Sequence, residues 1–165
     1  MNEKSIILYH GTDVKIPTPD LAKCKKFRDF GKAFYLSYNK ELAKDWAIKR
    51  NSASAKINDY GIVLNGVESC TLKIKRFKAD EQWAKFVYNN RTNKKFVRHN
   101  YDIIIGPIAD NTLQNWFNKI EEEGMTFSEV ASHIQYAKFK DDQYAFCSPR
   151  SLKLLKWEEC HDCQH

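Results

Sequence analysis

The stretch ILYHGT, Ile7–Thr12, passes from three apolar or aromatic side chains to a histidine, a glycine and a hydroxyl group. With the two residues before it, the stretch has the apolar run and the β-branched and aromatic content that are typical of a strand. A glycine at the end of such a strand lets another group approach the backbone closely, because glycine has no Cβ atom. The segment therefore predicts an N-terminal strand over 5–10 that ends in a candidate functional site at His10 and Gly11.

The rest of the chain alternates between extended and helical patterns, with no repeat, low-complexity tract or linker that would divide it. Extended segments are predicted over 33–37, 61–74 (one or two strands with a turn at Asn65-Gly66), 101–110 (a buried central strand) and 143–148, and residues 151–157 form a final apolar segment. Helices are predicted over 39–50 with Asn39 as cap, 81–90 after Asp80, 112–125 between Asp110 or Asn111 and Gly124, and 127–139 with a Thr126–Glu129 capping box. These patterns indicate a mixed α/β single domain.

Length and composition fit one soluble globular domain. The 165 residues include 10 Phe, 8 Tyr and 4 Trp, which is enough large side chains for one core. No apolar run approaches the roughly 20 residues of a membrane span, and the N-terminus has no signal-peptide pattern, so we expect a cytoplasmic protein without a membrane partner. The net charge of +6 permits a polyanionic partner but does not require one.

Three polar residues stand at the ends or within the predicted strands, namely His10, Tyr35 and Gln143. The sequences around the first two of these residues, YHGT (9–12) and DFGKAFYLS (29–37), resemble motifs of the ADP-ribosyltransferase superfamily of the His-Tyr-Glu type, which includes the poly(ADP-ribose) polymerases. Those enzymes carry a second aromatic residue eleven positions after the motif tyrosine, which here is Trp46.

Nearly the whole chain is similar to DUF3990, a family of small bacterial proteins of unknown function, through LYHGT, PDL (19–21), DFGKAFYLS, YDIIIGPIAD (101–110) and DQYAF (142–146). The resemblance implies an α+β fold: a single ADP-ribosyltransferase-like domain over 1–158, with a split, mostly antiparallel β core and flanking helices, and a polar C-terminal tail over 159–165. It also implies a small antitoxin-like partner protein, because this family is often paired with one in toxin–antitoxin-like loci.

The resemblance implies that NAD is the substrate and that the bond between ribose and nicotinamide is broken. His10 would bind a hydroxyl of the adenosine ribose, and the Gly11 backbone would pair with the nicotinamide amide. Tyr35 and Trp46 would enclose the nicotinamide ring, Thr12 completes the His-Gly-Thr motif, and Arg28 is a candidate for the pyrophosphate. The expected activity is mono-ADP-ribosylation of a protein or nucleic acid. The alternatives are a non-catalytic module that binds NAD, ADP-ribose or a protein, and an NAD hydrolase.

Gln143 departs from the pattern, because the polymerases carry a glutamate at the matching position. An amide can still bind a ribose hydroxyl, but it adds no negative charge beside a developing cation. We expect Asp141, two residues earlier, to supply the carboxylate, unless the acceptor needs no base or both residues belong to a solvated turn. Ala33 and Ala43 also stand where those enzymes carry glycine and serine.

The five cysteines, at 24, 70, 147, 160 and 163, do not form a disulfide framework. The tail CHDCQH (160–165) contains a C-x2-C half-site with two histidines, but no second ligand pair accompanies it elsewhere in the sequence. We therefore expect a frayed polar terminus and no bound metal.

Overall fold

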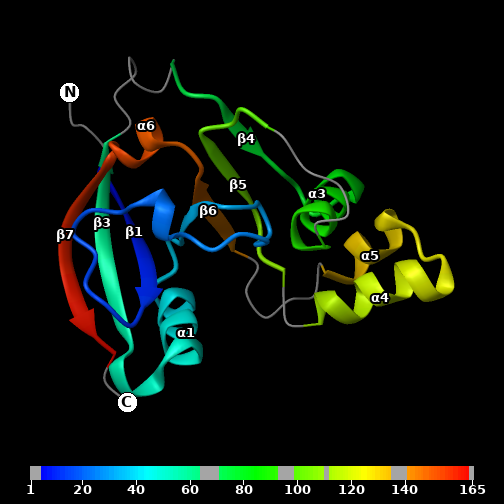
Figure 1. The fold of residues 1–165 in the computed structure, drawn as a ribbon, viewed down its shortest axis with the longest axis horizontal. Coiled ribbons are helices and arrows are strands. Elements are labelled where there is room, and N and C mark those ends of the chain that lie inside the picture. The colour runs from blue at the N-terminus through cyan, green and yellow to red at the C-terminus, as the bar shows by residue number, and fades with distance from the viewer. Residues whose placement is uncertain (1–4, 64–70, 93–98, 110–111, 135–140, 164–165) are drawn as a thin grey trace.

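The computed structural model describes residues 5–63, 71–92, 99–109, 112–134 and 141–163. In these ranges the chain forms two sheets (Figure 1). The first has the order β1-β3-β7 and the second the order β2-β6-β5-β4, and every pairing is antiparallel except that of β4 with β5. The strands are β1 (Ser5–Thr12), β2 (Phe34–Leu36), β3 (Lys56–Val63), β4 (Ile74–Arg76), β5 (Ile103–Pro107), β6 (Asp142–Phe146) and β7 (Leu155–Asp162). The α+β class with a split, mostly antiparallel core is confirmed.

The helices are α1 (Lys40–Arg50), α3 (Glu81–Thr92), α4 (Leu113–Glu123), α5 (Phe127–Ile134) and the short α6 (Pro149–Leu152), with 3-10 turns at Leu21–Lys23 and Ser52–Ser54. Three predicted end signals are confirmed. The Asn39 side chain accepts hydrogen bonds from Glu41 and Leu42 at the start of α1, Thr126 and Glu129 form a reciprocal capping box, and Gly124 ends α4 in the left-handed conformation.

Three predicted details involve residues outside the described ranges. Thr112 occupies the N-cap position of α4, and the expected caps Asp110 and Asn111 lie outside the described residues. The same is true of the expected Asn65-Gly66 turn and of residues 135–139 at the end of the fourth predicted helix. Within the described ranges, no helix is both long enough and apolar enough to cross a bilayer.

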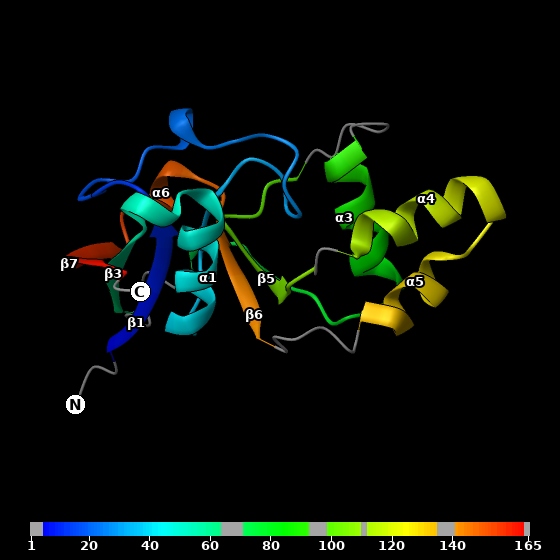
Figure 2. The ribbon, with the colours of Figure 1, turned by 90° about the horizontal axis from the view of Figure 1, so that it is seen from below.

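Two apolar clusters fill the spaces on either side of the second sheet. One lies between the sheets and includes Leu8, Phe34, Tyr60 and Phe146. The other lies between the second sheet and the group α3, α4 and α5, which Figure 1 shows beside β5 and Figure 2 shows from below. β5 contributes to both clusters, and its three isoleucines are buried, as predicted for a central strand.

The C-terminal segment corrects the expected polar tail. Residues 159–162 belong to β7, which pairs with β3 as far as Asp162, and the Cys163 amide bonds to the Ala55 carbonyl. Apolar Leu155 and Trp157 anchor this strand against the core. The polar residues that follow form its outer end because ladder pairing with β3, rather than apolar burial, holds them.

Candidate functional site

The candidate site is centred where the two sheets separate. Tyr9 of β1 and Ser37, just after β2, exchange two backbone hydrogen bonds of 2.7 and 2.9 Å. If this antiparallel pairing continued, Gly11 would stand opposite Tyr35. The pairing stops at this single bridge, so β1 and β2 separate at Gly11 and Tyr35.

The His10 side chain spans the point of separation. Its Nδ1 lies 2.7 Å from the backbone carbonyl of Tyr35, and its ring stacks on Phe34 with a centroid distance of 4.2 Å. A carbonyl only accepts, so Nδ1 carries the proton and Nε2 keeps its lone pair. The pKa of His10 is lowered to about 4, mainly by burial and also by the Arg50 charge, while the hydrogen bond to the Tyr35 carbonyl opposes this shift. His10 is therefore a neutral acceptor through Nε2 at physiological pH.

Gly11 is required by close packing of the first helix. A Cβ atom at this position would lie 1.8 Å from the carbonyl oxygen of Ala43 and 3.0 Å from the amide nitrogen of Ala47. Gly11 is extended, since its φ is not positive. The backbone approach expected for a ligand is thus occupied, on the side-chain face of Gly11, by α1.

The backbone edge of Gly11 remains open. In an antiparallel pair, successive residues direct their N–H and C=O groups alternately toward and away from the partner strand. Tyr9 directs both groups away from β3 to Ser37, so Gly11, two residues later, directs its own pair to the same edge. Neither group has a hydrogen bond with another described residue. A donor and an acceptor therefore stand side by side at the separation.

α1 brings Trp46 to this edge. Trp46 is half-buried and precedes Ala47, whose backbone contacts Gly11. Among the described residues, no ring contact joins Trp46 to His10 or to Tyr35. The structure therefore brings the Trp46 backbone near Gly11. The rings of Trp46 and Tyr35, which were expected to enclose the nicotinamide ring, do not touch each other.

Tyr35 has a structural task that the sequence does not reveal. Its hydroxyl donates to the Gly31 carbonyl (2.7 Å) and accepts from the Phe30 amide (3.0 Å), which closes the loop before β2. Burial, followed by the nearby charge of Asp29, raises the pKa of Tyr35 well above its usual value. Its ring lies on the opposite face of β2 from Phe34, because neighbouring strand residues alternate. His10 thus contacts the Tyr35 backbone rather than its phenol.

Gln143 is buried in β6, and its Nε2 donates to Asp29 Oδ2 (2.7 Å) and to the Pro107 carbonyl (3.3 Å). Both partners are acceptors, which fixes the orientation of the amide. Asp29 Oδ1 in turn accepts from Arg91 of α3, with distances of 2.6 Å to Nε and 2.5 Å to Nη2. Gln143 and Tyr35 lie on one face of the second sheet, since Tyr35 pairs with Ala145.

Asp141 and Gln143 have different hydrogen-bond partners. Its two oxygens accept hydrogen bonds of 2.5 Å from the Tyr38 hydroxyl and from the Asn39 amide, the cap of α1. These bonds, that of Asn39 first, lower the pKa of Asp141, which is therefore ionised at neutral pH. The carboxylate bonded to Gln143 is that of Asp29, which the sequence did not single out.

The two remaining site candidates differ in exposure. Thr12 is buried, and its hydroxyl donates to Asp13, which is paired with Arg50 at 2.7 Å. Arg28 is exposed in the loop that Tyr35 closes, and its carbonyl accepts from the Gly31 amide. The positive charge of Arg28 acts on Tyr35, lowering its pKa in opposition to burial.

A possible cation site involves the C-terminal strand, with residues other than the C-x2-C pair. His161 Nε2 lies 3.1 Å from an oxygen of Asp59 and 3.2 Å from one of Glu159, and the second oxygen of Asp59 is buried without a hydrogen bond. These three side chains could hold a metal ion. Direct contact of the histidine with the two carboxylates accounts for the same spacing.

Comparison with known proteins assigns the chain to a family. The molecule is a mixed α+β domain with two sheets that separate at a histidine-glycine pair. The chain belongs to DUF3990, described as a protein of unknown function, whose family model matches residues 6–157. The DUF3990 resemblance is thereby confirmed. No curated protein matches the chain, and no solved structure does.

Proposed function

We propose that the protein is a mono-ADP-ribosyltransferase that uses NAD. C1′ of the nicotinamide ribose loses nicotinamide, which keeps the bonding electron pair. A nucleophile of a macromolecular acceptor forms the new bond to C1′ and releases a proton. The observation that carries the proposal is the separation of β1 from β2, with a neutral imidazole and an unpaired backbone edge at one point.

Each group at the separation suits part of this substrate. Nε2 of His10 can accept a hydrogen bond from a ribose hydroxyl without adding a positive charge near a cationic ligand. The N–H and C=O of Gly11 match the acceptor and donor of a planar carboxamide. Trp46, on the helix that packs against Gly11, would offer an aromatic face to a pyridinium ring, whereas the Tyr35 ring lies on the opposite face of β2 from Phe34. Arg28, exposed in the neighbouring loop, is a donor for the pyrophosphate.

A glutamine at position 143 favours transfer of a single ADP-ribose over synthesis of a polymer. Its amide nitrogen is already held by Asp29, so the amide oxygen is the atom it can offer to a ribose hydroxyl. The negative potential next to Gln143 comes from Asp29, whereas Asp141 is bound to Tyr38 and Asn39. The same observation favours a second candidate, a non-catalytic module that binds NAD or ADP-ribose, because no carboxylate replaces the missing glutamate at position 143.

The test is release of nicotinamide from NAD in the presence of a cell lysate, with label followed in separated protein, RNA and DNA. We expect release with label in a macromolecule, and a decrease of about 100-fold in the rate for His10→Ala. His133→Gln, which changes an exposed histidine of α5, is the matched control and should retain the rate. Asp141→Asn separates assistance in catalysis from capping of α1, since rate loss with an unchanged melting temperature indicates the former.

Other outcomes identify the alternatives. NAD binding without release of nicotinamide supports the binding module and contradicts the proposal. Release without any labelled macromolecule supports an NAD hydrolase. A small antitoxin-like partner and a cytoplasmic location remain predictions that accompany the transferase proposal.

A further inference from the structure

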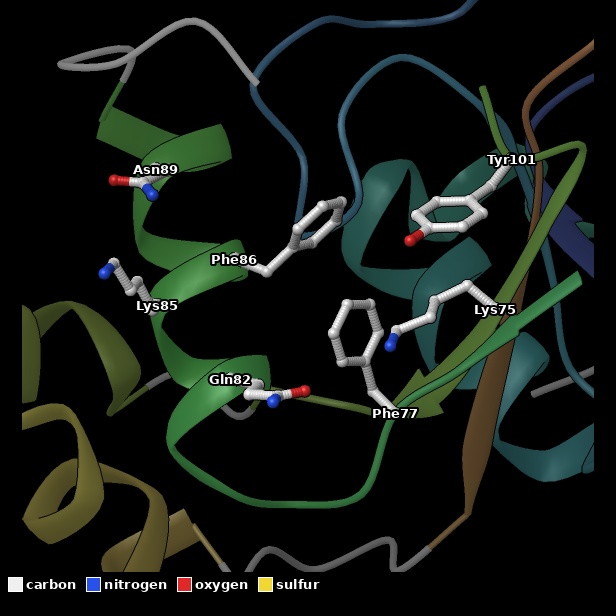
Figure 3. A pocket seen from close by; sticks show the side chains of 7 residues that line it. All are labelled: Lys75, Phe77, Gln82, Lys85, Phe86, Asn89 and Tyr101. Atoms are coloured by element: carbon white, nitrogen blue, oxygen red, sulfur yellow. The ribbon is translucent and has the colours of Figure 1, made fainter. Parts of the chain in front are cut away.

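A second candidate site lies between β4, at the edge of the second sheet, and α3 (Figure 3). It is an open pocket of about 320 Å³. The residues that line it are aromatic, basic or carboxamide, and none is acidic: Lys75, Phe77, Gln82, Lys85, Phe86, Asn89 and Tyr101. It shares no residue with the candidate site at His10.

The aromatic rings form a continuous series. The ring of Phe77 lies 4.9 Å from that of Phe86, Phe86 lies 5.8 Å from His99, and His99 lies 5.4 Å from Tyr101. All four side chains are half-buried, so each is anchored at the core and partly open to solvent. The planes of neighbouring rings differ by 24° to 47°, so this platform is a series of tilted, partly exposed rings on which flat heteroaromatic ligands can stack.

The polar residues surround this platform with donors. Gln82, Lys85, Phe86 and Asn89 lie on one face of α3, at helical spacing. Lys75, on β4, reaches over the Phe77 ring with its Nζ 5.0 Å from the centroid. Two ammonium groups without a carboxylate among the lining residues favour an anionic ligand, and the two carboxamides can pair with base edges.

We propose that this pocket binds single-stranded nucleic acid, with bases stacked on the ring series and phosphates next to Lys75 and Lys85. Charge and chemistry together favour this occupant, because an acidic peptide would match the lysines but not the platform. In a duplex the base faces are already stacked, which excludes them from the rings. Resting on the proposed function, we further infer that the bound strand is the ADP-ribose acceptor.

Phe30 connects the pocket to the candidate active site. Its ring is 5.9 Å from Phe77 and 6.2 Å from Phe86 behind the platform. Its backbone amide donates to the Tyr35 hydroxyl, which closes the loop next to the candidate NAD site. A strand on the platform would therefore lie beside the loop that carries Arg28 and Asp29.

The experiment measures binding of a labelled 12-nucleotide single strand by fluorescence anisotropy, without NAD, for RNA and DNA. The pocket variant is Lys75→Glu/Lys85→Glu. Its matched control is Lys153→Glu/Lys156→Glu, which makes the same charge change at two exposed lysines near β7. We expect the Kd to rise at least tenfold in the pocket variant and less than threefold in the control, and the salt slope to fall by about 1.4.

Phe86→Leu tests stacking while keeping apolar volume in the core, and should weaken binding about fivefold or more. An equal effect of both charge variants, binding of duplex or free mononucleotide as tight as that of the strand, or a strand Kd above roughly 100 μM in the folded protein would overturn the proposal. Nicotinamide release by the unchanged protein without oligonucleotide is measured separately. Failure of the strand site and failure of the transferase activity are thus distinguished.

Discussion

The two ring nitrogens of His10 do different things. Nδ1 donates to the Tyr35 carbonyl at the place where β1 and β2 part, and this requires a proton on Nδ1. Stacking on Phe34 buries the ring, which is why its pKa lies well below that of a free histidine. Burial thus keeps the ring neutral, and the bond to Tyr35 places its one proton on Nδ1, so Nε2 is left as an acceptor for a ligand.

This burial makes folding stability dependent on pH. The unfolded histidine binds a proton near pH 6.5 and the folded one only near pH 4, so stability is present above pH 6.5 and falls as the pH drops toward 4. We expect the contribution of His10 to the free energy of unfolding to fall by about 2 kcal/mol between pH 7.5 and pH 5. Urea denaturation at both values, on the unchanged protein and on His10→Gln, measures it. Parallel pH dependence in the two proteins would contradict a depressed pKa.

Single residues were predictable where the signal is local. The first strand and its histidine-glycine pair follow from consecutive residues, but the predicted end at His10 is wrong, because β1 stays paired with β3 through Gly11 as far as Thr12. The partner of Gln143 is Asp29, which is 114 positions away along the chain. No local pattern encodes such a pairing, so the sequence favoured Asp141, which stands two residues before Gln143 and would share its strand face.

At the scale of elements, the packing of α1 on β1 decides what residue 11 can be. The carbonyl of Ala43 and the amide of Ala47 are backbone atoms, which cannot rotate away as a side chain can. Ala43 is itself fully buried at this crossing. Close packing against α1 is thus a second reason for a glycine at position 11, in addition to the open backbone edge that it offers.

Gly11→Ala should therefore displace the helix. We expect a loss of about 3 kcal/mol in the free energy of unfolding, because strand and helix backbones must move apart. Gly124→Ala is the matched control, since nothing lies within 4 Å of its added methyl group and only its φ of +70° opposes the change. That control should cost about 1 kcal/mol. Equal losses in urea denaturation would show that the close crossing does not exist in solution.

The element boundaries that sequence could predict are those with a chemical end signal, such as the Asn39 cap, the Thr126–Glu129 box and Gly124. The elements near the C-terminus of the given sequence were harder to predict. Residues 151–157 were expected as one apolar segment, yet Ser148 and Pro149 start a short helix and a strand follows it. Alternation in β7 is interrupted after Trp157, where the register with β3 shifts between Asp59 and Tyr60, so its extent depends on the partner strand.

At the scale of the whole molecule, one buried network joins three parts of the fold. Arg91 belongs to α3, Asp29 to the loop before β2, and Gln143 to the second sheet. The network contains one positive and one negative charge, with a neutral amide donor as the third member. It holds the loop before β2, in which Phe30 packs against the rings of the proposed nucleic-acid pocket.

Gln143→Glu, which restores the residue found in the polymerases, should therefore destabilise this protein. The new carboxyl group would meet the Asp29 carboxylate, so its pKa in the folded state is raised and its destabilising effect grows as the pH rises above about 4.3. We expect a loss of about 3 kcal/mol at pH 8 and a smaller one at pH 5.

The double change Asp29→Asn/Gln143→Glu is the control for this prediction, because it exchanges donor and acceptor while keeping the charge of the network. It should recover most of the stability at pH 8 in urea denaturation. A pH-independent loss in Gln143→Glu, or no recovery in the double variant, would contradict repulsion between the two carboxyl groups as the cause.

The strand order β1-β3-β7 has a consequence for how the chain is made. The central strand of that sheet is flanked on one side by the beginning of the described chain and on the other by its last strand. During translation, β1 and β3 leave the ribosome long before the residues that complete their sheet. One side of β3 therefore stays unpaired, and available to chaperones, until residues 155–162 have emerged.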